Sequence, residues 1–401
     1  MSVTAAQGFR AAGVAAGLKS TGRPDVAVVV NDGPSDVASA VFTSNRVEAA
    51  PVTWSRQAVA DGRARAVVLN SGGANACTGP EGFADTHRTA EHLADALGIS
   101  SVDTVVCSTG LIGTRLPMDA LLSGVDDAVA HLSADGGEDA AHAIMTTDTV
   151  PKTVTVTVTT DPETQDANET APGTWTVGGM AKGAGMLAPG LATMLCVLTT
   201  DALVEPALAD AALRAATART FDRVDSDGCM STNDTVVLLA SGASGVSPSP
   251  EELTDALTEA CASLARQLVG DAEGASHDIS VRVVGATTED AAVAVARAVT
   301  RSNLFKAAVF GNDPNWGRVL SAVGTVPVSV APFDAAHLDV SINGVQVCRA
   351  GGVGDPRELV DMASARDVTV VVDLHAGDAE ATVWTNDLTH DYVHENSAYS
   401  S

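Results

Sequence analysis

Apolar and polar positions along the chain follow two different periods, which predict strands and helices respectively. Short apolar runs that end at glycine, proline or polar residues are typical of buried strands. Such runs occur at residues 26–31, 38–42, 66–70, 104–107, 175–180, 194–198, 236–240, 279–284, 338–342, 368–374 and 379–384. Residues 153–160 alternate threonine with valine, which predicts a strand with one face toward solvent.

Apolar residues spaced three and four apart predict helices with one buried face. The clearest helix begins at Ser249, where Pro250 follows the cap residue and Glu252 can reach back to it. Its buried face is predicted to contain Leu253, Leu257, Cys261, Leu264 and Leu268. Further helices are predicted at residues 81–97, 118–132, 205–220 and 288–300, whereas residues 306–310 are predicted to form a strand or a buried turn.

Polar, glycine-rich segments follow several predicted strands. Residues 70–79 can direct backbone N–H groups at an anion, or can form a plain turn between strand and helix. Thr109 and Gly110 can aim a hydroxyl and a backbone N–H at one point, as an oxyanion requires, although this composition is also ordinary for a loop. Residues 225–235 favour a supporting hydrogen-bond network over a metal site, because they lack the spacing of a hard-cation loop.

The segment from residue 182 to residue 198 suggests a specific chemistry. A glycine- and proline-rich loop enters an apolar strand, and Thr193 stands at the junction. Its hydroxyl can attack the carbonyl carbon of Ala192, which turns the peptide into an ester that water can hydrolyse. Thr193 would then carry a free amine, with a pKa of about 7.7–8, that can take the proton from its own hydroxyl. A threonine at this place can also simply pack or cap.

Composition narrows the classes of function. The chain has 401 residues, enough for two or three packed units, and a net charge of −27, which argues against nucleic acid or an anionic membrane as partner. None of the six cysteines forms a C-x-x-C pair or lies at metal-ligand spacing from a histidine, so we expect no metal, no disulfide framework and no cofactor. No apolar run reaches roughly 18–20 residues and no signal peptide is evident, so we expect a cytoplasmic protein.

The loop before Thr193 resembles the cleavage site of the ornithine acetyltransferase (glutamate N-acetyltransferase) family. The family pattern Lys-Gly-x-Gly-Met-x-Ala-Pro-x-x-Ala-Thr-Met-Leu matches residues 182–195 without a gap. Further segments of the resemblance follow the same order, at residues 8–19, 42–52, 70–79, 108–113, 145–152, 231–235, 271–274, 311–318 and 396–401. The polar loop at residues 161–173 is longer than we expect for the family.

This resemblance implies an α+β fold, with an N-terminal-nucleophile-like αββα sandwich and a smaller, strand-rich C-terminal α/β domain. Self-cleavage would give an alpha chain of residues 1–192 and a beta chain of residues 193–401. Residues from 193 to about 285 would complete the catalytic core, and those from about 286 to 401 would form the C-terminal domain. The two chains are expected to assemble as an α2β2 heterotetramer.

The resemblance also assigns roles to individual residues. Thr193 would be the nucleophile and, through its amine, the base, while Thr109 and Gly110 would form the oxyanion hole. The substrate site would be lined by Thr146, Lys182, Thr193, Glu273, Asn396 and Ser401. Lys182 offers a cation to a substrate carboxylate and Glu273 an anion to an ammonium group. From the residues alone, Glu273 can equally be a solvated turn residue, and the C-terminus can fray.

The implied reaction is a ping-pong transfer of an acetyl group. N2-acetyl-L-ornithine would acetylate Thr193 and leave as L-ornithine, and L-glutamate would then take the acetyl group and leave as N-acetylglutamate. The sequence leaves open whether acetyl-CoA also serves as donor. Two alternatives remain: an N-terminal-nucleophile amide hydrolase or aminopeptidase, and an acidic binding protein whose chain stays uncleaved.

Overall fold

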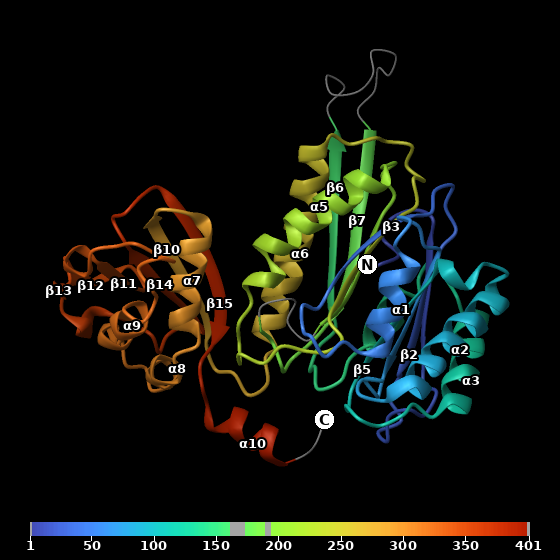
Figure 1. Cartoon of the computed structure of the whole chain (residues 1–401), viewed down its shortest axis with the longest axis horizontal. Helices are drawn as coiled ribbons and strands as arrows, with labels where there is room; N and C mark the ends of the chain where they lie inside the picture. Colours follow the sequence, from blue (N-terminus) through green and yellow to red (C-terminus); the bar gives the residue numbers. More distant parts are fainter. Residues whose placement is uncertain (1, 161–172, 189–193, 399–401) are drawn as a thin grey trace.

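The computed structural model describes residues 2–160, 173–188 and 194–398, and these form two lobes (Figure 1). The smaller lobe contains residues 278–386, and the larger lobe contains nearly all of the remaining described residues. Ala192, Thr193 and Ser401 lie outside the described residues, as does most of the predicted loop at 161–173.

Two sheets make up the centre of the larger lobe, with the strand orders β1-β2-β4-β5 and β3-β9-β8-β7-β6. The strands of the first sheet are β1 (Phe9–Val14), β2 (Val26–Asn31), β4 (Ala66–Ser71) and β5 (Thr104–Thr109). Those of the second sheet are β3 (Val37–Phe42), β6 (Lys152–Thr160), β7 (Gly173–Lys182), β8 (Leu195–Thr200) and β9 (Thr235–Ala240).

The two sheets face each other across one apolar core. Val29 and Val67 of the first sheet share this core with Val197 and Leu239 of the second. All residues of β2, β4, β5, β8 and β9 are buried, because alternate side chains point to the inner core and to the outer helices. The uninterrupted apolar runs in the sequence reflect this burial on both faces.

Helices cover the outer face of each sheet, which gives the four layers of an αββα sandwich (Figure 1). The first sheet is covered by α1 (Ala50–Ala58), α2 (Gly79–Leu97) and α3 (Met118–Ala130), and α4 (Gly137–Ala143) packs beside β1. The second sheet is covered by α5 (Pro206–Arg219) and α6 (Pro250–Gly270). This arrangement confirms the predicted α+β fold. No helix in the described ranges is both long and apolar enough to cross a membrane.

Helix α6 begins with the capping box that the sequence predicted. The backbone N–H of Glu252 donates to the Ser249 hydroxyl at 3.2 Å, and the Glu252 carboxylate accepts from the Ser249 N–H at 2.8 Å. The five residues of the predicted buried face are all buried. The helix ends at Gly270, directly before two carboxylates, Asp271 and Glu273, that lie near the site described below.

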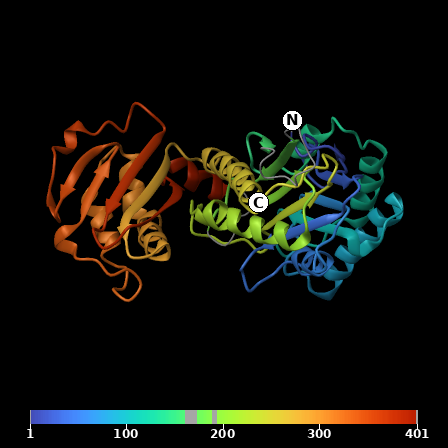
Figure 2. The same ribbon diagram turned by 90° about the horizontal axis from the view of Figure 1, so that it is seen from above.

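The smaller lobe is a six-stranded sheet, in the order β13-β12-β11-β14-β10-β15, with helices packed against it. Its strands are β10 (Asp278–Ala286), β11 (Asp339–Ile342), β12 (Val345–Arg349), β13 (Gly352–Val353), β14 (Asp367–Asp373) and β15 (Ala379–Asn386). Its helices are α7 (Glu289–Thr300), α8 (Asn303–Phe310) and α9 (Trp316–Val323). The two lobes lie end to end along the molecule (Figure 2). The last helix, α10 (His390–Ala398), runs back from the smaller lobe toward the larger one (Figure 1).

Two expectations from the sequence differ from this structure. Strand β10 pairs with β14 and β15, so the smaller lobe begins at Asp278 and not after residue 285. Residues 306–310 belong to helix α8, which Ser302 caps by accepting from the Phe305 N–H at 3.3 Å. An apolar run of so few residues does not distinguish a helix from a strand by its periodicity.

Candidate active site

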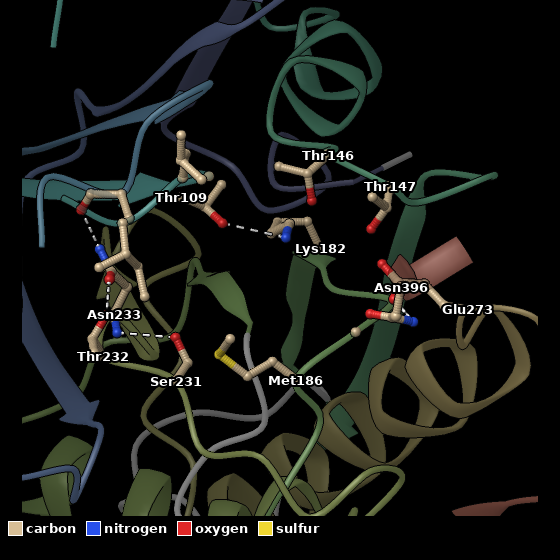
Figure 3. Close-up of a pocket in the computed structure, with 15 residues that line it drawn as sticks. Thr109, Thr146, Thr147, Lys182, Met186, Ser231, Thr232, Asn233, Glu273 and Asn396 are labelled. Carbon is tan, nitrogen blue, oxygen red and sulfur yellow. Dashed lines mark hydrogen bonds between the residues drawn. The ribbon is translucent and has the colours of Figure 1, made fainter. Parts of the chain in front are cut away.

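A pocket of about 220 Å³ opens in the larger lobe, where the ends of β5 and β7 meet. Its lining includes six of the nine residues that the sequence singled out (Figure 3): Thr109, Gly110, Thr146, Lys182, Glu273 and Asn396. The other three, Ala192, Thr193 and Ser401, lie outside the described residues. The fold therefore brings together residues from two sheets, the end of α6 and the last helix.

Lys182 is the last residue of β7, and only 3% of it is exposed. Its Nζ lies 3.4 Å from the Thr109 hydroxyl and 4.0 Å from the Asp148 carboxylate. Burial lowers the pKa of Lys182, and the negative charge of Asp148 opposes that shift. The pocket thus contains a cation that is largely removed from water and that can bind a carboxylate.

Asp148 lies behind Lys182 and is buried. Burial raises the pKa of its carboxyl, but the ammonium groups of Lys182 and Lys152 outweigh that effect, and the pKa falls to about 2. Asp148 is therefore a carboxylate at neutral pH, where it also accepts from the Gly183 N–H at 2.6 Å.

Thr109 and Gly110 stand at the end of β5. The Thr109 carbonyl accepts from the N–H groups of Gly72 and Gly73, at 2.9 and 3.0 Å. The carbonyl and the N–H of one trans peptide point in opposite directions. Because the Thr109 carbonyl points toward Gly72 and Gly73, the Gly110 N–H points away from them. Gly110 has φ +132°, and a Cβ there would lie 2.6 Å from the Gly73 nitrogen, so the position requires glycine.

The Thr109 hydroxyl can donate a hydrogen bond into the pocket. It accepts the hydrogen bond from Lys182, so its own proton is free for another acceptor. A hydroxyl and a backbone N–H from adjacent residues can then converge on one oxygen atom, which is the geometry that stabilises an oxyanion.

Glu273 lies on the other side of Lys182 from Thr109 (Figure 3). Its backbone N–H donates to the Ala184 carbonyl at 2.9 Å, and its carboxylate accepts from the Asn396 side chain at 3.0 Å. A Cβ at Gly185 would lie 2.5 Å from this carboxylate, so glycine permits the close approach. The pocket therefore presents an anion near the buried cation.

A polar turn between α5 and β9 forms another wall of the pocket. The Asn233 side chain donates to the carbonyls of Ala74 and Ser108, at 2.6 and 2.8 Å, and accepts from the Thr232 hydroxyl at 2.6 Å. These bonds confirm the supporting network that the sequence suggested for residues 225–235. The described residues include no cluster of three or more side chains that could hold a metal ion.

The sequence did not single out several residues of the lining, among them Leu111, Ile112, Thr147, Met186 and Ser231. All five lie in segments that resemble the ornithine acetyltransferase family, and Met186 is a fixed position of its cleavage-site pattern. That resemblance was the signal that could have found them.

The chain directly after residue 193 is fixed by two hydrogen bonds. The Met194 N–H donates to the Asp234 carboxyl at 3.1 Å, and the Thr235 N–H donates to the Met194 carbonyl at 3.1 Å. Asp234 is completely buried, and burial raises the pKa of its carboxyl well above the usual range. Met194 thus enters β8 beside the parallel strand β9.

Comparison with known families identifies the family of this chain. The sequence model of the ArgJ family matches residues 10–401. The chain belongs to the ArgJ family. This assignment confirms the resemblance that the cleavage-site pattern indicated.

Relatives of the ArgJ family resemble this chain over its whole length. The arginine biosynthesis bifunctional protein ArgJ of Streptomyces coelicolor is 63% identical over 401 residues, which cover 100% of both chains. The protein of the same name from Thermobifida fusca is also 63% identical over 401 residues, with the same coverage. Among solved structures, ornithine acetyltransferase of Mycobacterium tuberculosis, complexed with ornithine, is 51% identical. That match covers 48% of this chain and 96% of the other, with a TM-score of 0.41.

Proposed function

We propose that this chain is an acetyltransferase of arginine biosynthesis that moves the acetyl group of N2-acetyl-L-ornithine to L-glutamate. The products are L-ornithine and N-acetylglutamate. Membership of the ArgJ family and the names of its relatives support the reaction class. The observation that supports the site most directly is the pocket, in which Thr109, Gly110, Lys182 and Glu273 meet.

The proposed enzyme matures by cutting its own chain. The Thr193 hydroxyl attacks the carbonyl carbon of Ala192, the C–N bond breaks, and an ester links the two residues. Water then cleaves the ester, which leaves a carboxylate on Ala192 and a free amine and hydroxyl on Thr193. The resulting chains contain residues 1–192 and 193–401, and we propose that they assemble as an α2β2 heterotetramer in the cytoplasm.

Acetyl transfer then takes place on the new chain end. The Thr193 amine accepts the proton of its own hydroxyl, whose oxygen attacks the acetyl carbon of the donor. The Thr109 hydroxyl and the Gly110 N–H stabilise the negative oxygen of the tetrahedral intermediate. The intermediate collapses to an ester of Thr193, and the ammonium returns its proton to the departing amine of ornithine. The amine of glutamate reverses these steps and takes the acetyl group.

The charged residues of the pocket fit amino-acid substrates. Lys182 would bind a carboxylate, while Glu273 and Asn396 would bind an ammonium group. Thr146 and Ser401 would complete this site. We include acetyl-CoA as a second candidate donor, because the similar proteins have "bifunctional" in their names.

A donor and acceptor assay tests the proposal. The purified protein is incubated with N-acetylornithine, with and without glutamate, and N-acetylglutamate and free acetate are measured. We expect N-acetylglutamate to form faster than acetate when glutamate is present. An amide hydrolase with the same nucleophile would release acetate at a rate that glutamate does not reduce, and that result would contradict the transferase.

A further inference from the structure

A buried ion network lies behind the wall of the pocket. Lys152, the first residue of β6, is completely buried, and its ammonium lies between two carboxylates. It is 2.7 Å from Asp148 and 2.6 Å from Asp271. A buried cation with two anionic partners is costly to assemble, so its role needs an explanation beyond stability.

Asp148 connects this network to the cationic side of the pocket. Its carboxylate accepts from the N–H of Gly183, directly after Lys182, and from the N–H of Thr146 at 2.9 Å. It also lies 4.0 Å from the Lys182 ammonium. One carboxylate therefore holds the backbone at Thr146 and at Gly183 and also acts on the charge of Lys182.

Asp271 connects the network to the anionic side. It directly follows helix α6 and stands two residues before Glu273. It accepts from the Thr149 N–H at 3.0 Å and from the Thr149 hydroxyl. The Lys152 ammonium thus joins the segment that precedes β6 to the segment that carries Glu273.

We propose that Asp148, Lys152 and Asp271 are positioning residues that fix the separation between Lys182 and Glu273, and so match the pocket to a substrate with both a carboxylate and an ammonium group. This inference rests on the proposed function, because it assumes that these two residues bind the amino acid. None of the three is proposed to touch the substrate.

The charge of Lys182 gives the network a measurable signature. Burial lowers the pKa of Lys182, and Asp148 is the nearest group that opposes this. The charged and titratable groups that act on Lys182 are Asp148, Lys152, Glu273, Asp234 and Lys19. Loss of the Asp148 charge would lower the pKa of Lys182 further. The neutral amine would then appear at a lower pH, and the KM for a carboxylate substrate would rise from that pH upward.

The test compares Asp148→Asn with the wild type and with Asp85→Asn. Asp85 is a matched control, because it is a buried carboxylate in an ion pair with Arg115, at 2.7 Å, and does not line the pocket. We expect Asp148→Asn to raise the KM for glutamate about tenfold or more, while kcat changes less than about threefold. The pH above which KM rises should fall by about one unit or more. The control should keep the wild-type KM and pH dependence.

Two further variants test the proposal independently of Asp148→Asn. Asp148→Glu restores the charge and should recover part of the KM. If Asp148→Asn does not fold, Asp271→Asn takes its place as the test of the positioning role. Asp271→Asn should raise the KM for glutamate more than it lowers kcat. Rates are normalised to the amount of cleaved chain.

Wild-type KM and an unshifted pH dependence in a folded Asp148→Asn protein would overturn the positioning role. Failure of the wild-type protein to transfer acetyl would instead overturn the proposed function. The two results are therefore distinguishable.

Discussion

At the scale of single residues, the contact between Lys182 and Thr109 joins the residue that we propose binds substrate to one that we propose stabilises the oxyanion. The buried ammonium donates to the Thr109 hydroxyl at 3.4 Å, which leaves the hydroxyl proton for the developing oxyanion. The same ammonium has Asp148 behind it at 4.0 Å. In the proposed mechanism, one cation therefore orients the Thr109 hydroxyl and offers charge to a substrate carboxylate.

Removal of the Thr109 hydroxyl should slow the chemical step. We expect Thr109→Val to lower kcat by about 10²–10³-fold, the usual loss when one oxyanion donor is removed. Thr109→Ser keeps the hydroxyl and should retain most of the wild-type kcat. Steady-state kinetics with N-acetylornithine and glutamate measure both variants, and equal rates for Thr109→Val and the wild type would exclude Thr109 from the oxyanion hole.

The Thr193 amine predicts a pH dependence with a definite sign. This amine acts as base only when neutral, and its reference pKa is about 7.7–8. The rate of acetyl transfer should therefore fall as the pH decreases below that pKa. A rate that stays constant down to about pH 5 would contradict an amine base with that reference pKa.

At the scale of secondary-structure elements, the strand ends and the end of α6 place the site. Strands β4 and β5 are parallel and end together at Ser71 and Thr109, and β7 ends at Lys182 in the facing sheet. Helix α6 ends at Gly270, directly before the segment with Asp271 and Glu273. The proposed oxyanion donors and Lys182 therefore lie at strand ends, and the position of Glu273 depends on the end of one helix.

The capping box of α6 can be tested by a substitution at Ser249. Replacement of Ser249 by alanine removes one half of the capping box and should destabilise the first turn by about 1 kcal/mol. Amide exchange at Glu252 and Leu253 should accelerate about fivefold. Ser249→Asp retains a capping side chain and serves as the control. Unchanged exchange in Ser249→Ala would show that the box does not stabilise this helix.

Sequence periodicity predicted the buried strands and long helices well, because burial on one or both faces leaves a clear pattern. It missed β1, whose residues Phe9–Val14 include an arginine, a glycine and two alanines. This strand lies at the edge of its sheet, with β2 as its neighbouring strand, so its sequence need not be strongly apolar. The short helices α1, α4 and α9 also passed unnoticed, because seven to nine residues contain too few turns for a pattern.

The candidate site was predictable only in part. A resemblance in sequence motifs located six residues that line the pocket, and the structure shows that they meet. Neither periodicity nor motif indicated Lys152 and Asp271 as partners, because their contact joins the start of β6 to the end of α6. Contacts between residues so far apart in the sequence depend on how the two sheets and their helices pack.

At the scale of the whole molecule, the last helix returns to the pocket from the smaller lobe. Helix α10 follows β15 and runs toward the larger lobe (Figure 1), where Asn396 donates to Glu273 at 3.0 Å. The lobes also meet where Arg301 pairs with Asp225 at 2.7 Å. The helix that follows the smaller lobe therefore supplies the candidate site with Asn396.

Truncation after Thr389 tests this contribution. It removes Asn396 and Ser401 but leaves both sheets of the larger lobe, so the chain should still cleave itself while the KM for glutamate rises about tenfold or more. Ser397→Ala is the control in the full chain, because Ser397 donates to the His394 carbonyl within its own helix. A truncated enzyme with wild-type KM would show that α10 does not contribute to substrate binding.

The most direct measurement is the mass of the protein after incubation with N-acetylornithine alone. We predict two chains, the second beginning Thr-Met-Leu and heavier by one acetyl group on Thr193. Glutamate should remove that group, and Thr193→Ala should give one intact chain without it. A continuous, unacetylated chain that still transfers acetyl to glutamate would contradict the account.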